Sequence, residues 1–197
     1  MDKQQLMASI RSGMPERRWQ HVQGVIDTSI VLAERFGADP VKAELAAILH
    51  DLAKFWPVER MQEYVREEGV DLAVLDYDKE LWHAPAGAWA AVKDYGIDDP
   101  EVLDAVRYHT SGRAGMTLLE RVVCLADYME PGREFPGVDR IRELADSDLD
   151  AALVAGFDST IRFLLEKGKR IYPLTVAARN DLIRTTTNII FTAQGGN

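Results

Sequence analysis

Apolar residues recur every three or four positions along most of this chain, and the two-residue alternation typical of strands is scarce. The longest such pattern runs from Glu16 to Phe36, and Gly37 is placed to end it. One face of this predicted helix carries Val22, Ile26, Ser29, Ile30 and Ala33. The periodicity therefore predicts an all-α fold.

Capping and breaking residues divide the rest of the chain into further helices. Asp39-Pro40 and Asp99-Pro100 each combine an N-cap with a proline at the first helical position, and Thr117 to Glu120 forms a capping-box pattern. The predicted helices run from Pro40 to His50-Asp51, Val58 to Glu68 (ended by Gly69), Asp99-Pro100 to about Tyr108-His109, Thr117 to just before Pro131-Gly132, Leu149 to Lys167 and Val176 to Phe191.

The remaining segments are predicted to be irregular. Residues 70–78 are predicted to form a polar, acidic loop, and residues 111–115 are predicted to form a second loop, which is not acidic. Ala84-Pro85 is expected to interrupt a helical segment, which would place His83 at a break. We find no repeat and no linker, so residues 1–197 are expected to form one domain with a frayed tail at about 194–197.

Composition is typical of a soluble globular chain, with 47% hydrophobic and 28% charged residues. The net charge of −9 argues against a nucleic-acid-binding surface, which needs a basic face. The single cysteine, Cys124, is interpreted as a core residue, and it favours a reducing compartment. Without a signal-like N-terminus or a bilayer-length apolar run, the chain is expected to be cytoplasmic and independent of membranes.

Histidines and aspartates at the ends of predicted helices are the candidate chemistry. His21 lies on the first long helix, His50 and Asp51 end the next, and Asp127 lies near the end of an apolar one. Two imidazoles and two carboxylates form a mixed nitrogen and oxygen set, which suits iron, manganese, cobalt or zinc better than calcium or magnesium.

Each of these residues alone has an ordinary explanation, because lone histidines are usually core or surface residues and lone aspartates are usually caps. The residues around Asp127 favour the interpretation as a metal ligand, because its helix is too apolar for Asp127 to be an ordinary solvent-exposed charge. An unpartnered buried carboxylate costs several kcal/mol, an order-of-magnitude figure, unless a charge or a metal accompanies it.

The ordered set of His21, His50-Asp51 and Asp127 resembles the signature of the HD-domain metal-dependent phosphohydrolases. The flanking segments narrow the resemblance to the bacterial YqeK-type branch of symmetric diadenosine tetraphosphate hydrolases. These segments are His50–Lys54, Trp82–Ala88, Tyr108–Thr110 and Leu125–Arg133. The resemblance spans roughly residues 18–175 and implies an HD-domain helical bundle.

This resemblance implies that iron is held by His21, His50, Asp51 and Asp127, and that His83 and His109 face the nucleotide phosphates. Imidazoles can donate to phosphate or act as general acids, although related enzymes can use them for a second metal. We favour one ion over two. Lys54 joins the two histidines as a candidate catalytic residue, and a structural salt bridge is the alternative for it.

Further residues are predicted to contact nucleotide. Arg133 and Thr110 could bind phosphate, although a surface charge and a helix cap are their plainer explanations. The locally basic segment 167–175 ends a helix, and in the resembling branch a matching segment contacts nucleotide. The complete predicted nucleotide-binding set is His21, Lys54, His83, His109, Thr110, Asp127, Arg133, Arg170, Ile171, Tyr172, Pro173 and Thr175.

The expected activity is therefore symmetric cleavage of diadenosine tetraphosphate into two ADP, and a homodimer is the candidate assembly. One alternative keeps the site and changes the substrate to another nucleotide or phosphoester. The other alternative is a non-catalytic domain that senses nucleotide or metal.

Overall fold

The computed structural model describes residues 2–194, with side-chain environments given to residue 184, and within this range every regular element is helical. The α-helices are α1 (Lys3–Ser12), α2 (Glu16–Phe36), α3 (Pro40–Leu49), α4 (Val58–Glu68), α5 (His83–Tyr95), α6 (Pro100–Tyr108), α7 (Leu118–Met129), α8 (Val138–Ala145), α9 (Leu149–Glu166) and α10 (Pro173–Gln194). Two short 3₁₀ turns, η1 (Leu72–Asp76) and η2 (Lys79–Leu81), precede α5. The prediction of an all-α fold is confirmed.

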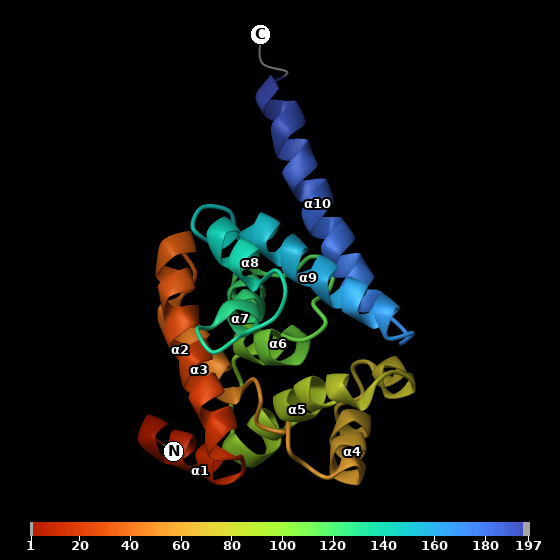
Figure 1. The fold of residues 1–197 in the computed structure, drawn as a ribbon. Helices are drawn as coiled ribbons and strands as arrows, with labels where there is room; N and C mark the ends of the chain where they lie inside the picture. Colours follow the sequence, from red (N-terminus) through yellow and green to blue (C-terminus); the bar gives the residue numbers. More distant parts are fainter. Residues whose placement is uncertain (1, 195–197) are drawn as a thin grey trace.

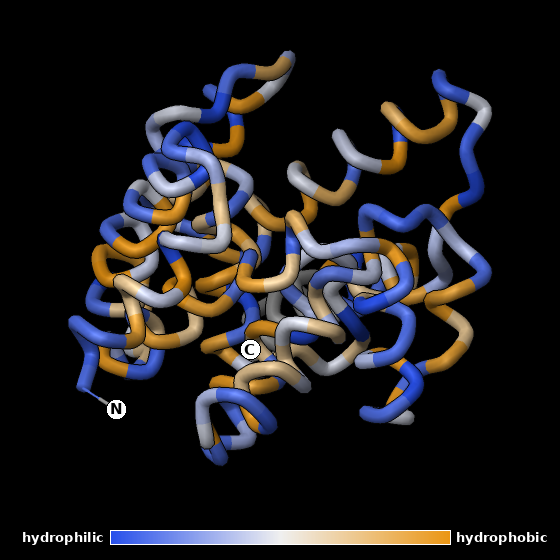
Figure 2. The backbone as a smooth tube through the Cα atoms, turned by 90° about the horizontal axis from the view of Figure 1, so that it is seen from below, coloured by the Kyte–Doolittle hydropathy of each residue, from blue (hydrophilic) through white to orange (hydrophobic). Residues whose placement is uncertain are grey.

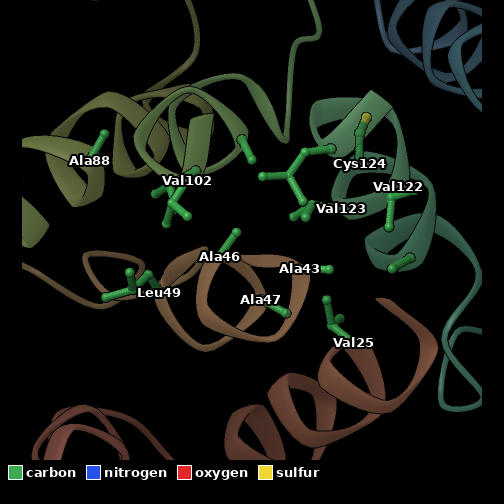
Figure 3. Close-up of a cluster of buried hydrophobic side chains, with 14 of the residues drawn as sticks. Val25, Ala43, Ala46, Ala47, Leu49, Ala88, Val102, Val122, Val123 and Cys124 are labelled. Atoms are coloured by element: carbon green, nitrogen blue, oxygen red, sulfur yellow. The ribbon is translucent and has the colours of Figure 1, made fainter. Parts of the chain in front are cut away.

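The core forms where α2, α3, α6 and α7 pack together (Figure 1). Figure 3 shows Val25, Ala46, Val102 and Val123 directed into one apolar cluster from these four helices. The alanines of α3 are completely buried and let neighbouring helices approach closely. Hydrophobic and hydrophilic residues are interspersed along the helices (Figure 2). No described helix is long and apolar enough to cross a membrane.

Local signals in the sequence placed several helix ends correctly. The predicted bounds of α2 and α4 are confirmed, and Gly37 and Gly69 end these helices in the left-handed conformation. Asp39 caps α3 by accepting hydrogen bonds from the N–H groups of Val41 and Lys42, at 2.8 and 3.2 Å. These caps fix where α3 begins, and therefore where its far end presents His50 and Asp51.

The predicted interruption at Ala84-Pro85 is wrong. Helix α5 begins at His83 and continues through Pro85, which is its third residue. Backbone N–H groups in a first helical turn have no acceptor within the helix, so a proline costs little there. His83 therefore opens a helix instead of standing at a break.

Two short helices were not predicted, and one long helix was predicted too short. Only Leu6 and Ile10 of α1 are buried, and α8 has eight residues, so both patterns are weak. Helix α10 begins at Pro173 instead of Val176 and continues to Gln194, away from the helical body (Figure 1). Gln194 lies within α10, whereas the rest of the predicted frayed tail lies outside the described residues. A single domain over residues 1–197 stays a prediction.

Candidate functional site

Four different helices bring the four histidines into one buried cluster. His21 comes from α2, His50 caps the end of α3, His83 opens α5 and His109 caps the end of α6. The ring centroids of His50 and His109 lie 5.1 Å apart, and those of His83 and His109 lie 5.1 Å apart. The ring of His21 lies 5.5 Å from that of His50. All four histidines of the chain therefore lie within one cluster.

Hydrogen bonds fix the tautomer of each ring. His50, His83 and His109 each donate from Nδ1 to the backbone carbonyl three residues earlier, at 2.7, 2.8 and 2.7 Å. His21 Nδ1 lies 3.0 Å from a carboxylate oxygen of Glu130. A neutral imidazole with a proton on Nδ1 presents an acceptor lone pair at Nε2, which is the form that binds a metal.

The Asp51 carboxylate lies at the centre of the cluster and is 1% exposed. Its oxygens lie 3.1 Å from His50 Nε2, 3.2 Å from His83 Nε2 and 3.7 Å from His21 Nε2. None of these contacts has hydrogen-bond geometry. Both Asp51 oxygens and the Nε2 atoms of His21 and His50 are buried without a hydrogen-bond partner within the described part of the chain.

This geometry fits a metal ion. Two donor atoms that each lie about 2.1 Å from an ion, at right angles, are about 3.0 Å apart. Several donor distances in the cluster have this value, and buried polar atoms without partners are costly unless a ligand satisfies them. Two overlapping groups bring their donor atoms within 4.8 Å of one another: His21, His50 and Asp51, and Asp51, His83 and His109.

Asp127, at the end of α7, lies beside His21 and is not a member of either group. Its Oδ1 lies 3.0 Å from His21 Nε2, and it also forms an ion pair with Arg133. The structure thus brings together all four residues predicted as metal ligands, and they come from three separate helical segments.

Electrostatics keeps the carboxylate charged and two of the imidazoles neutral. Burial opposes ionisation of Asp51, but the neighbouring His50 and His83 outweigh it and hold the Asp51 pKa well below its usual value. Burial lowers the pKa of His83, and it lowers the pKa of His109 to about 3. Burial also opposes protonation of His50, but the negative charge of Asp51 prevails and raises the His50 pKa.

Two site residues were missed by reasoning from the sequence. Arg18 lies one turn before His21, and its guanidinium contacts Asp51 Oδ2. Glu130, which is 3% exposed, holds His21 Nδ1 and lies three residues after Asp127. Helical spacing from the predicted ligands could have indicated both residues, because positions three apart share a helix face.

A cavity of about 800 Å³ opens above the cluster. Such a volume is typical of small-molecule sites. Nine residues of the predicted nucleotide-binding set line it, namely Lys54, His83, His109, Thr110, Asp127, Arg133, Arg170, Tyr172 and Thr175. His21, Ile171 and Pro173 are not among the lining residues, and neither are His50 and Asp51, which lie beneath it.

The cavity carries more basic than acidic side chains, although the whole chain is acidic. Its six cationic residues are Arg18, Lys54, Arg133, Arg162, Lys169 and Arg170. Four acidic residues also line it, namely Asp78, Glu80, Asp127 and Glu166. This local excess of positive charge suits an anionic ligand.

The basic segment after α9 folds against the acidic segment before α5. Lys169 Nζ lies 2.6 Å from Asp78 Oδ2, and Arg170 donates to the Asp76 carbonyl. The Tyr172 ring lies 4.9 Å from that of Tyr77. Lys54 likewise forms a 3.0 Å ion pair with Glu80, which is the salt bridge given above as the alternative to a catalytic role. Lys54 also lines the cavity.

A helical bundle with converging imidazoles and carboxylates beneath a cation-lined cavity defines a domain with a candidate metal centre. Residues 18–132 match the HD domain family, and the chain belongs to that family. The resemblance inferred from the sequence motifs is confirmed.

Relatives with established names extend this similarity over most of the chain. The chain is 48% identical over 183 residues to a symmetrical bis(5'-nucleosyl)-tetraphosphatase of Bacillus subtilis (strain 168). The matched region covers 93% of this chain and 98% of that protein. A protein of the same name from Staphylococcus aureus (strain NCTC 8325 / PS 47) is 40% identical, over 85% of this chain and 87% of its own.

A solved structure shows the same fold. The crystal structure of a protein from Clostridium acetobutylicum, described as a predicted HD superfamily hydrolase involved in NAD metabolism, matches with a TM-score of 0.90. The two chains are 41% identical, and the match covers 94% of this chain and 98% of the other.

Proposed function

We propose that this chain is a metal-dependent phosphohydrolase that cleaves diadenosine tetraphosphate symmetrically into two molecules of ADP. The observation that carries the proposal is the group of buried donor atoms that have no hydrogen-bond partner among the described residues, beneath a cavity rich in cations. The substrate is supported by the names of relatives that are 40% to 48% identical over most of their length.

His21, His50, Asp51 and Asp127 are the proposed metal ligands. Iron is the proposed ion, with manganese, cobalt and zinc as alternatives that the same donor set accommodates. When bound, the ion supplies a Lewis acid that polarises phosphoryl oxygen and lowers the pKa of water. One ion is favoured over two, and Asp51, His83 and His109 are the residues that would hold a second.

His83 and His109 are proposed to act on the phosphate chain from the floor of the cavity. Donation to phosphate requires a proton on Nε2, because Nδ1 of each ring is already bonded to a carbonyl. Burial disfavours that proton, as the low pKa of His109 shows. The negative charge of a tetraphosphate acts in the opposite direction and raises the pKa of a neighbouring imidazole.

Other cavity residues are proposed to bind the charge and the nucleoside. Lys54 and Arg133 would neutralise charge that develops on the departing ADP, and Thr110 would donate its hydroxyl to phosphate. Residues Arg170, Ile171, Tyr172, Pro173 and Thr175 would hold one nucleoside. The ligand class is therefore a dinucleoside polyphosphate or an ADP-like nucleotide.

The biological setting follows from less direct observations. The lone cysteine, Cys124, is buried and unpaired, which agrees with a reducing compartment, so we place the protein in the cytoplasm. Homodimer formation stays a prediction.

Product analysis tests the proposed activity. The metal-loaded protein is incubated with diadenosine tetraphosphate, and the products are separated by anion-exchange chromatography. ADP as the sole nucleotide product supports the proposal. AMP with ATP, or cleavage only of other nucleotides, rejects the proposed substrate; binding without any turnover favours a sensor.

A further inference from the structure

One arginine on the cavity wall has no ion-pair or hydrogen-bond partner among the described residues. Of the six cations that line the cavity, Arg18, Lys54, Arg133 and Lys169 form ion pairs, and Arg170 donates to a backbone carbonyl. Among the described residues, Arg162 contacts no acidic group within ion-pair distance and forms no hydrogen bond through its side chain. Arg162 can therefore bind an anion without first losing a contact.

The residue beside it is a phenylalanine that the core does not use. Helix α9 carries two phenylalanines: Phe157 is completely buried, whereas Phe163 is 53% exposed. A single exposed apolar side chain is ordinary on a protein surface. Phe163, however, lines the cavity directly beside Arg162, so its ring is available to a ligand.

These two residues belong to a wall that the proposed metal and ADP contacts do not include. Helix α9 packs on α7, α8 and α10 (Figure 1). It contributes Ser159, Thr160, Arg162, Phe163, Leu164 and Glu166 to the lining of the cavity. The proposed contacts to one nucleoside come instead from the segment 170–175, after α9 has ended.

A dinucleoside tetraphosphate has a second nucleoside that needs its own contacts. A purine stacks on an aromatic face, and a phosphate oxygen binds a guanidinium. We propose that Arg162 and Phe163 form a subsite for the second nucleotide half, with Phe163 against the base and Arg162 on the adjacent phosphate. This inference rests on the proposed function and deepens it, because it explains selectivity for a substrate with two nucleosides.

Two substrates that differ only in the second nucleoside test the subsite. Diadenosine tetraphosphate is compared with adenosine 5′-tetraphosphate, used as substrate or as competitive inhibitor, in the metal-loaded enzyme. Phe163→Ala is expected to raise KM for the dinucleotide about tenfold, the order expected for loss of one stacked base. KM or Ki for adenosine tetraphosphate is expected to stay unchanged.

Matched control variants come from exposed positions that do not line the cavity. Leu165 is 64% exposed and does not line the cavity, so Leu165→Ala should change neither constant. Arg140 of α8 is exposed and does not line the cavity, so Arg140→Ala controls for loss of charge in Arg162→Ala. Arg162→Ala should weaken binding of the dinucleotide, and Arg140→Ala should not.

Calorimetric titration with a methylene-bridged, non-hydrolysable diadenosine tetraphosphate gives a readout that does not need turnover. Weaker binding in Phe163→Ala, with unchanged binding of adenosine tetraphosphate, supports the subsite. Equal losses for both ligands, or no loss for either, overturn it. Failure of the wild-type enzyme to cleave the dinucleotide would instead reject the proposed function, so the two failures are distinguishable.

Discussion

His21 differs from the other three histidines because Glu130, a carboxylate, holds its Nδ1 at 3.0 Å, where the others bond to backbone carbonyls. The other oxygen of Glu130 accepts from the N–H of Gly132 at 2.6 Å. A Cβ at Gly24 would lie 2.5 Å from this second oxygen, so glycine leaves the space that the carboxylate occupies. Glu130 therefore orients His21 toward Asp51 and Asp127.

Replacing Glu130 by glutamine should weaken metal binding without unfolding the protein. Two N–H groups donate to the two Glu130 oxygens, and an amide can accept only one of these bonds. Loss of a residue that orients a ligand typically costs about tenfold or more in metal affinity. Competition with a chromophoric chelator measures the metal Kd. An unchanged Kd in Glu130→Gln would show that Glu130 does not position His21.

Removal of a proposed ligand should abolish both the bound metal and the activity. His50→Ala deletes an Nε2 atom that is buried without a hydrogen-bond partner, and Asp127→Ala deletes the carboxylate beside His21. Elemental analysis and the cleavage assay are applied to the same preparations, with circular dichroism to verify folding. Full activity in either folded variant would contradict the ligand set.

Substitution of His109 separates the one-metal arrangement from the two-metal arrangement. His109 Nε2 lies 3.2 Å from His83 Nε2, and these two residues form the second donor group with Asp51. If His109 acts only on phosphate, His109→Ala should keep the metal content of the wild type and lose turnover. Loss of one stoichiometric ion in this variant would show that His83 and His109 hold a second metal.

Two glycines with similar backbone conformations offer a stability test. Gly112 and Gly115 have φ values of 62° and 71°, so alanine is strained at both. A Cβ at Gly112 would also lie 2.6 Å from Phe157 and 2.8 Å from Ala178, whereas at Gly115 it meets nothing within 4 Å. Gly112→Ala should lower the free energy of unfolding by about 1–3 kcal/mol more than Gly115→Ala. Equal losses in urea denaturation would contradict tight packing around Gly112.

Local chemistry explains which parts of the fold and site could be predicted from the sequence. Helix boundaries are set by residues next to them in the sequence, such as Asp39-Pro40, Asp99-Pro100 and Gly37. The helix ends that carry His50 and His109 could therefore be predicted. The prediction at Pro85 was wrong because a helix tolerates proline in its first turn, and the sequence around Pro85 does not show that α5 begins at His83.

Tertiary packing explains most of what remained hidden. Glu130 meets His21 from 109 positions away, and the α9 wall reaches the cavity only because the chain returns across the end of α7. No local pattern marks Arg162 or Phe163 as part of a site, since their significance depends on which surfaces face the cavity.

Elemental analysis of the purified wild-type chain tests the metal site most directly. The convergence of His21, His50, Asp51 and Asp127 predicts about one equivalent of iron, manganese, cobalt or zinc per chain, retained through gel filtration. A chain that cleaves diadenosine tetraphosphate at full rate while carrying none of these metals, before and after treatment with a chelator, would contradict the account.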